Sequence, residues 1–148
     1  VAPHSIRALV LAPARELANQ VHESIRQYAV HLPLTTYAAY GGVCINPQMM
    51  KLRRGVDVLV ATPGRLLDLH RQNAVKFSQL QTLLLDEADR MLDLGFAEEL
   101  RGSYAVRPKQ RQTLLLSATF SDELRLLAAQ QPDGPAPSAD RPRPAARR

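Results

Sequence analysis

Three carboxylates follow an apolar run in the stretch LLLDEAD, from Leu83 to Asp89. Placing charge beside buried apolar side chains costs free energy unless a partner offsets that cost. A divalent cation is one such partner, because enzymes that transfer phosphoryl groups hold Mg²⁺ through an Asp at the end of a buried strand. Asp86 has that position, and it is our candidate metal-associated residue.

The neighbouring carboxylates have different candidate roles. Glu87 is placed to orient or deprotonate an attacking water, and Asp89 to accept hydrogen bonds from Ser117 or Thr119. The alternative is that all three carboxylates only complement the N-terminal dipole of a helix that begins near Ala88. The tetrapeptide alone does not decide between the two.

Five short apolar runs are predicted to be strands, and three of them are nearly unbroken, as in strands buried on both faces of a parallel sheet. They are 6–12, 34–40, 56–62, 80–86 and 111–119. Between the first two, apolar residues recur at helical spacing and predict an amphipathic helix, with Leu17, Val21, Ile25 and Tyr28 on its apolar face. The expected fold class is α/β, a doubly wound parallel sheet with crossover helices.

Each expected strand is followed by an unusual cluster of residues. In chain order these are APARELA (12–18), YGG (40–42), ATPGR (61–65), DEAD (86–89) and SAT (117–119). The carboxyl ends of parallel strands meet at one edge of the sheet, where ligands bind in such folds. We therefore expect all five clusters on that edge.

Composition limits the possible partners and the cellular location. The chain has 148 residues and a net charge of +5. The first 130 residues contain 15 basic and 12 acidic groups, a net charge of only +3, so the charge is weak evidence for a nucleic-acid partner. The tail 131–148 is rich in Pro and Arg, and we expect it to be disordered. One cysteine, Cys44, and the lack of a signal peptide or long apolar run favour a cytoplasmic protein and no membrane partner.

In order and approximate spacing, the five clusters resemble the motifs of the DEAD-box RNA helicases, from about Arg7 to Ala129. Two longer stretches, YGGVCINPQMMKLRRGVDVLVATPGRLLDLHRQNAV and LDEADRMLDLGF, are similar to the bacterial RhlE-type branch. The resemblance implies that 1–130 is part of the first RecA-like domain of a P-loop NTPase. It also implies ATP and Mg²⁺ as cofactors and RNA as partner.

Site roles follow from the same resemblance. Asp86 matches the carboxylate that holds Mg²⁺ through water, and Glu87 the carboxylate that activates water. Ser117 and Thr119 match the motif that couples hydrolysis to strand separation, with Asp89 as their partner.

The remaining clusters match the contacts of the family to the RNA backbone: Pro13, Arg15, Gly41, Gly42, Thr62, Gly64 and Arg65. Thr62 followed by Pro63 is a strong helix start, with a hydroxyl cap and free amides for a phosphate. The two adjacent glycines let a backbone approach closely, although a tight turn explains them equally well. Backbone contacts predict sequence-independent, salt-sensitive RNA binding.

The chain also departs from the family pattern. Ala14 stands where the family usually has Thr, which removes a possible helix cap, and 101–110 is unusually polar, which predicts a weakened helix. None of the seven glycines is followed by Lys, so the phosphate-binding Walker A loop is absent, and no second RecA-like domain is recognisable.

Because half of the expected catalytic groups are missing, we expect the chain alone to hydrolyse little or no ATP. Val1 in place of Met is consistent with a fragment, and a missing first strand should leave a gap beside the strand of Asp86. Two alternatives remain. They are a non-catalytic RNA-binding module derived from a helicase, and a fragment of another P-loop ATPase, which would leave PARELA and TPGR unexplained.

Overall fold

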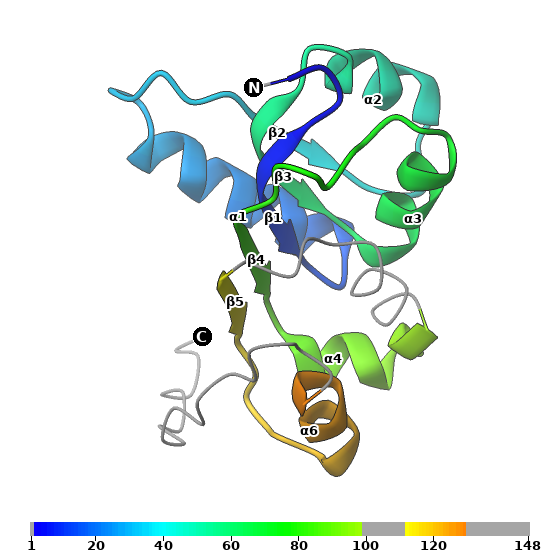
Figure 1. The fold of residues 1–148 in the computed structure, drawn as a ribbon. Coiled ribbons are helices and arrows are strands. Elements are labelled where there is room, and N and C mark those ends of the chain that lie inside the picture. Colours follow the sequence, from blue (N-terminus) through cyan, green and yellow to red (C-terminus); the bar gives the residue numbers. More distant parts are fainter. Residues whose placement is uncertain (1, 99–111, 130–148) are drawn as a thin grey trace.

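The structure, a computed structural model, describes residues 2–98 and 112–129. Five strands alternate with five helices along the described chain (Figure 1). The strands are β1 (Ile6–Leu11), β2 (Thr36–Ala39), β3 (Val56–Ala61), β4 (Thr82–Leu85) and β5 (Gln112–Leu115). The helices are α1 (Arg15–Tyr28), α2 (Ile45–Leu52), α3 (Pro63–Arg71), α4 (Ala88–Asp93) and α6 (Asp122–Ala129).

All strand pairs are parallel, and the sheet has the order β2-β3-β1-β4-β5. The most apolar runs occupy the three central places, since a strand between two neighbours is covered on both faces by crossover helices. Parallel α/β architecture with crossover connections is therefore confirmed. All five expected strands exist, each shorter than its apolar run, and β5 has four residues where the run has nine.

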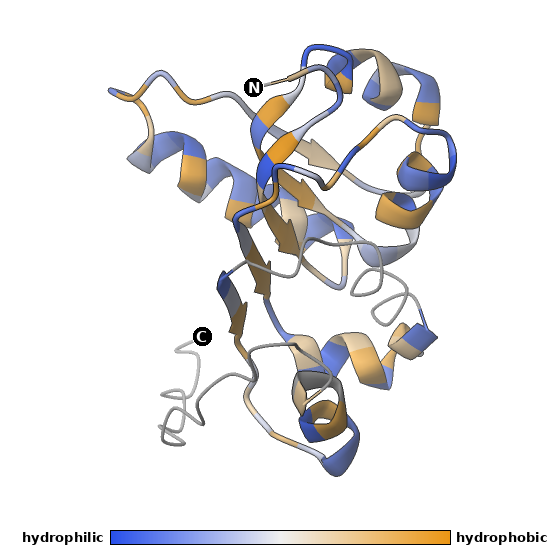
Figure 2. Ribbon diagram, viewed as in Figure 1, coloured by the Kyte–Doolittle hydropathy of each residue, from blue (hydrophilic) through white to orange (hydrophobic). Residues whose placement is uncertain are grey.

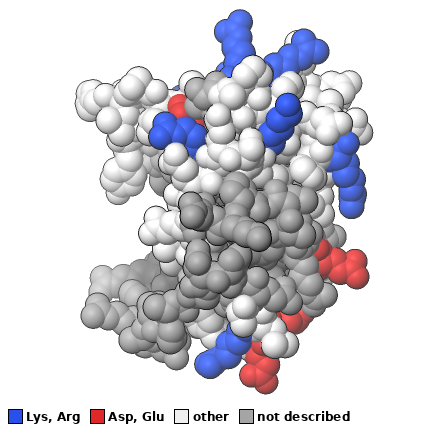
Figure 3. Space-filling model, in the orientation of Figure 1, with Lys and Arg blue, Asp and Glu red and all other residues white. Residues whose placement is uncertain are grey.

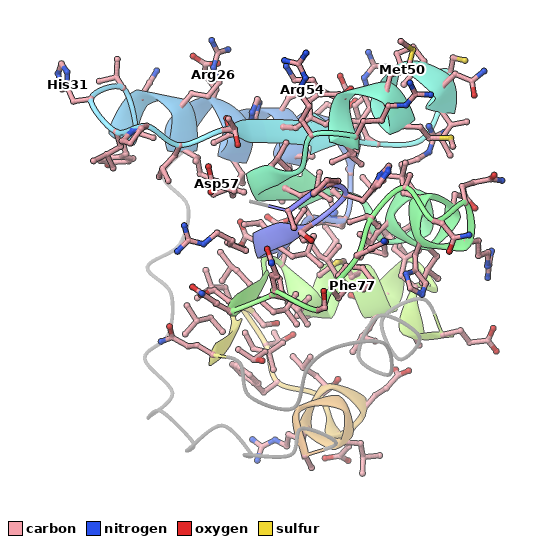
Figure 4. The ribbon with its side chains drawn as sticks, turned by 45° about the horizontal axis from the view of Figure 1, so that its top comes forward. Arg26, His31, Met50, Arg54, Asp57 and Phe77 are labelled. Atoms are coloured by element: carbon pink, nitrogen blue, oxygen red, sulfur yellow. The ribbon has the colours of Figure 1, made fainter. Side chains whose placement is uncertain are left out.

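Apolar side chains form a core on each face of the sheet. Alternation along β1 sends Leu9 and Leu11 into the larger core, under α2, α3 and α4, and sends Val10 into the smaller core under α1. Figure 2 shows this pattern as hydrophobic strands between helices of mixed colour. In Figure 4, Phe77 lies in the interior, whereas Met50 and Arg54 lie at the outer surface around α2.

The amphipathic helix α1 differs from its prediction at one end. Leu17, Val21 and Ile25 pack against the smaller core as expected, but Tyr28 is 89% exposed. At about 1.5 Å per residue, a helix of 14 residues is longer than the four-residue strand β2 beneath it, so its last turn overhangs the sheet. Figure 1 shows α1 extending beyond the strands.

The expected gap beside the strand of Asp86 is wrong. β4 lies between β1 and β5, and it pairs with both. Among the described strands, the outer positions belong to β2 and β5 instead. The expectation came from the family resemblance, whereas in this structure β4 and β5, which are consecutive in the chain, pair directly and leave no gap between them.

Two predictions fall outside the described residues: the weakened helix at 101–110 and the disordered tail at 131–148. Over 2–98 and 112–129, none of the helices combines the length and the apolar character that a membrane span requires. Basic side chains of Lys51, Arg53 and Arg54 are exposed at the end of α2, and Figure 3 shows Lys and Arg projecting around the part of the surface that α2 and α3 form.

Candidate functional site

The carboxyl ends of the five strands are in register, which places the five sequence clusters on one edge. Leu11 pairs with both Ala61 and Leu85, Ala61 also pairs with Ala39, and Leu85 with Leu115. The residues that follow these pairs therefore leave the sheet side by side. This confirms the expectation that the DEAD, SAT, TPGR and PARELA clusters share an edge.

Asp86 is at the centre of this edge. Its amide continues the β-ladder by donating to the carbonyl of Leu11 at 2.9 Å, and the residue is only 8% exposed. The buried strand before it fixes the backbone, so the carboxylate is held at the sheet edge instead of moving with a surface loop. A buried carboxylate at this place suits a ligand that carries positive charge.

Glu87 has an unusual backbone conformation, with φ 51° and ψ 50° in the left-handed region. It is the N-cap residue of α4, but its side chain makes no capping hydrogen bond. The carboxylate instead pairs with Arg90 at 3.4 Å, in a partly exposed ion pair of the kind that contributes little to stability. The strained backbone turns Glu87 out of the strand and leaves its carboxylate partly accessible.

Asp89, Ser117 and Thr119 form a closed hydrogen-bonded ring. The amide of Asp89 donates to Ser117 Oγ at 3.1 Å, and Ser117 Oγ donates to the carbonyl of Thr119 at 2.6 Å. Thr119 Oγ1 donates to Asp89 Oδ2 at 3.0 Å, and the Thr119 amide reaches the same oxygen at 3.3 Å. The predicted hydrogen bond from a hydroxyl to the Asp89 carboxylate is confirmed for Thr119, whereas Ser117 instead accepts from the Asp89 amide.

The ring also lowers the pKa of Asp89. Burial of the carboxyl group acts to raise its pKa, but the interactions with the Ser117 and Thr119 side chains and with backbone amides outweigh burial, so the pKa lies below its usual value. Asp89 Oδ1 also accepts from the Arg90 amide at 2.9 Å. The Asp89 carboxylate thus also accepts a hydrogen bond from an amide in the first turn of α4, as the alternative interpretation proposed for all three carboxylates.

A metal at this edge would meet few carboxylates. In the described part of the chain, His, Cys, Asp and Glu do not gather in groups of three that could bind an ion. Mg²⁺ in phosphoryl-transfer sites is held by one or two carboxylates, with waters and substrate phosphates as its other ligands. The single buried carboxylate of Asp86 fits that mode.

The PARELA cluster begins α1. Pro13 is buried, Ala14 is the N-cap residue and makes no side-chain cap, and Arg15 opens the helix. The guanidinium of Arg15 lies over the ring of Tyr40, 4.9 Å from the ring centroid. This cation–π contact joins the first cluster to the second.

Gly41 and Gly42 form an exposed turn after β2. Gly42 has φ +81°, a conformation that favours glycine, and a Cβ added at either glycine would have no atom within 4 Å. The turn therefore requires glycine at position 42 for its backbone conformation. The space around both glycines is open to a ligand.

The TPGR cluster begins α3 as predicted, with Thr62 at the N-cap and Pro63 in the first turn. The predicted hydroxyl cap is wrong, because the Thr62 side chain makes no capping hydrogen bond. Arg65 donates through Nη1 to Gln48 Oε1 and through Nη2 to the carbonyl of Val43, both at 3.0 Å. Two local networks thus share the edge, one after β4 and β5 and the other after β1, β2 and β3.

Sequence analysis missed Gln48, a buried residue of α2 that contacts this second network. A glutamine between Pro47 and two methionines gave no motif to notice. The only available signal was a polar residue on the inward face of a short amphipathic helix, where burial demands hydrogen-bond partners.

Comparisons with known proteins agree with this arrangement. Residues 2–127 match the model of the DEAD/DEAH box helicase family. The chain is 45% identical over 127 residues to "DEAD-box ATP-dependent RNA helicase 52A" of Oryza sativa subsp. japonica, which covers 83% of this chain and 21% of that protein. It is 42% identical over 126 residues to "DEAD-box ATP-dependent RNA helicase CshA" of Streptococcus pneumoniae, covering 85% of this chain and 24% of the relative.

A third relative is "ATP-dependent RNA helicase DBP2" of Encephalitozoon cuniculi, which is 46% identical over 120 residues, covering 81% of this chain and 24% of the relative. The chain therefore spans about a fifth to a quarter of the length of these curated relatives.

Proposed function

Because the chain belongs to the DEAD/DEAH box helicase family, we propose that it is a segment of an ATP-dependent RNA helicase, which couples ATP hydrolysis to the unwinding or remodelling of RNA. The observation that carries the proposal is the shared edge. Asp86, Glu87 and the Asp89–Thr119 hydrogen bond lie at the carboxyl ends of the same sheet as the starts of α1 and α3.

In the nucleotide half of this site, Asp86 would hold Mg²⁺ through water, and the bound ion would neutralise charge on the phosphates of ATP. Glu87 is proposed to accept a proton from the attacking water or to orient it, since its carboxylate is partly accessible. Asp89, Ser117 and Thr119 are proposed to couple hydrolysis to the separation of RNA strands. Their ring ties the segment after β5 to the start of α4, so a displacement of one is transmitted to the other.

In the RNA half, the proposed contacts are made by the residues that follow β1, β2 and β3: Pro13, Arg15, Gly41, Gly42, Thr62, Gly64 and Arg65. Backbone amides at the start of α3 and the open glycine turn suit a phosphate chain. Contacts of this kind carry no base information, so binding is proposed to be independent of sequence.

We propose that this chain, residues 1–130 of which belong to the first RecA-like domain, acts together with a second such domain outside it. The coverage of about a quarter of each relative supports this. Since no glycine is followed by Lys, the 148 residues lack the phosphate-binding loop and should hydrolyse little ATP alone.

We also propose membership of the bacterial RhlE-type branch, supported by the stretches 40–75 and 85–96. A phylogenetic tree that includes the region 6–98 tests this branch, and a position among other branches would contradict it. A cytoplasmic location is proposed from the single cysteine and the RNA partner, and is tested by fractionation of cells that express a tagged chain.

The decisive experiment measures RNA affinity and ATP hydrolysis of the chain with Mg²⁺. We expect binding of single-stranded RNA that weakens with salt, and turnover far below that of an intact helicase. Arg15→Gln and Arg65→Gln should each weaken binding and reduce the salt slope by about 1, whereas Arg26→Gln, at the far end of α1 (Figure 4), should change neither.

The outcomes separate the alternatives. The first comparison uses the chain joined to its missing domains, with and without ATP. If this longer protein binds RNA in a salt-dependent way and its affinity does not change with ATP, a non-catalytic RNA-binding module is favoured. Full ATP turnover by the 148 residues alone would contradict the proposed dependence on a phosphate-binding loop.

A further inference from the structure

Gln48 is a buried polar residue at the centre of the RNA half of the site. It belongs to α2, a surface helix whose neighbouring residues Asn46 and Pro47 are exposed, yet Gln48 itself is only 4% exposed. A buried amide costs free energy unless both its donor and its acceptor are used. The contacts of Gln48 therefore show what it does.

Both ends of the Gln48 amide are engaged. Nε2 donates to the carbonyl of Tyr40 at 3.1 Å, and Oε1 accepts from Arg65 Nη1 at 3.0 Å. Arg65 then donates through Nη2 to the carbonyl of Val43 at 3.0 Å. Gln48 and Arg65 thus hold the two residues that flank Gly41 and Gly42, one on each side of the turn.

The same network reaches α1, because the ring of Tyr40 lies under the guanidinium of Arg15 at 4.9 Å. Three clusters that are far apart in the sequence are therefore joined through one short segment. Gln48 is the residue that connects the glycine turn with the start of α3.

We propose that Gln48 is a positioning residue that holds the Gly41–Gly42 turn in the conformation that binds RNA. This inference rests on the proposed RNA-binding function. Two adjacent exposed glycines have large conformational freedom, and no side chain packs within 4 Å of where their Cβ atoms would be. Ordering the turn before RNA arrives removes that entropic cost from binding.

The geometry requires an amide. A carboxylate at position 48 would still accept from Arg65, but it would place negative charge beside the carbonyl of Tyr40 and lose the donor. A thioether of similar length would lose both hydrogen bonds while filling the same space. Gln48→Glu and Gln48→Met therefore remove one and two contacts respectively.

The test uses fluorescence anisotropy with a labelled single-stranded RNA of mixed sequence, over a range of salt concentrations, with hydrogen exchange at residues 41–43. We expect Gln48→Met to weaken RNA binding about tenfold and Gln48→Glu by less, with faster exchange in the turn. Because Gln48→Met changes no charge and removes no phosphate contact, its salt slope should stay as in the wild type. Asn46→Met, on the exposed side of the same helix, is the matched control and should change none of these quantities.

The results distinguish this inference from the function on which it rests. If the wild type binds RNA and Gln48→Met and Gln48→Glu bind it equally well, the positioning role is wrong and the proposed function stands. If the wild type does not bind RNA, both fail. A reduced salt slope in Gln48→Met would also overturn the inference, because it would indicate lost phosphate contacts. Should Gln48→Met fail to fold, hydrogen exchange at residues 41–43 in Gln48→Glu tests the loss of the Tyr40 contact alone.

Discussion

The hydroxyl of Thr119 donates a 3.0 Å hydrogen bond to the carboxylate of Asp89, which lies 30 residues earlier in the chain. The bond ties the segment after β5 to the first turn of α4. Thr119→Val keeps the shape and removes the donor, so we expect a loss of about 1 kcal/mol in unfolding free energy. Urea denaturation measures this loss, and Thr113→Val, the same change within β5, is the control.

If Thr119→Val matches the control in stability, the ring around Asp89 does not stabilise the fold.

Asp89 should also make stability depend on pH. Its pKa is lowered in the folded state, so its contribution is present above the unfolded pKa of about 3.9 and is lost as the pH falls through the folded value.

Asp57, which is labelled in Figure 4, should make a second contribution to stability that is lost in acid. It is the second residue of β3 and so lies near the amino ends of the strands, away from the carboxyl-end site. Its carboxylate accepts from the amide of Thr35 at 2.9 Å and from the Thr35 hydroxyl at 3.1 Å, and lies 3.7 Å from Arg7. The amide of Thr35 is the main cause of a lowered pKa, which burial opposes. Stability from Asp57 is therefore full at neutral pH and is lost below about pH 4.

Asp57→Asn should lower the unfolding free energy at pH 7 by roughly 1–3 kcal/mol and flatten its decrease toward pH 3. Denaturant titrations at both pH values measure this. Asp68→Asn is the control, since the Asp68 carboxylate is exposed and pairs with Arg71 at 3.8 Å, an interaction that contributes little to stability. An equally steep acid dependence in Asp57→Asn would contradict the assignment.

Ala14 predicts a stabilising change. It is the N-cap residue of α1 in an extended conformation, with φ −141° and ψ 155°, and it offers no side-chain oxygen to the helix amides. Ala14→Ser should raise the unfolding free energy by about 1 kcal/mol. Ala29→Ser, at the other end of the same helix, should give no such gain, and a thermal melt of both variants decides.

The overhang of α1 predicts a contrast between two apolar residues. Ile25 packs against the smaller core and Tyr28 is 89% exposed. Ile25→Ala should therefore cost on the order of 1–3 kcal/mol, whereas Tyr28→Ser should change stability by less than about 0.5 kcal/mol. Equal losses would mean that the last turn of α1 packs against the sheet after all.

Much of the site at the sheet edge could be predicted from sequence, because the carboxyl ends of parallel strands all lie at the same edge of the sheet. Once five apolar runs were taken as parallel strands, the residues after them had to share an edge, and Asp86, Ser117 and Thr62 do. Gln48 could not be found in this way, because its role depends on carbonyls that approach only in the folded chain. The lone charge within β3, Asp57, did carry a signal, since a buried carboxylate demands partners. The expected gap beside Asp86 was wrong because the pairing partners of β4 depend on tertiary packing that apolar runs alone do not specify.

The left-handed backbone of Glu87 has a consequence for the evolution and engineering of this protein. Glutamate at φ 51° is strained by roughly 1–3 kcal/mol, a cost that glycine would not bear. Selection for heat resistance alone would thus tend to replace Glu87 by glycine and discard the carboxylate. Its retention would be evidence that chemistry, and not thermal endurance, determines which side chain occupies the position.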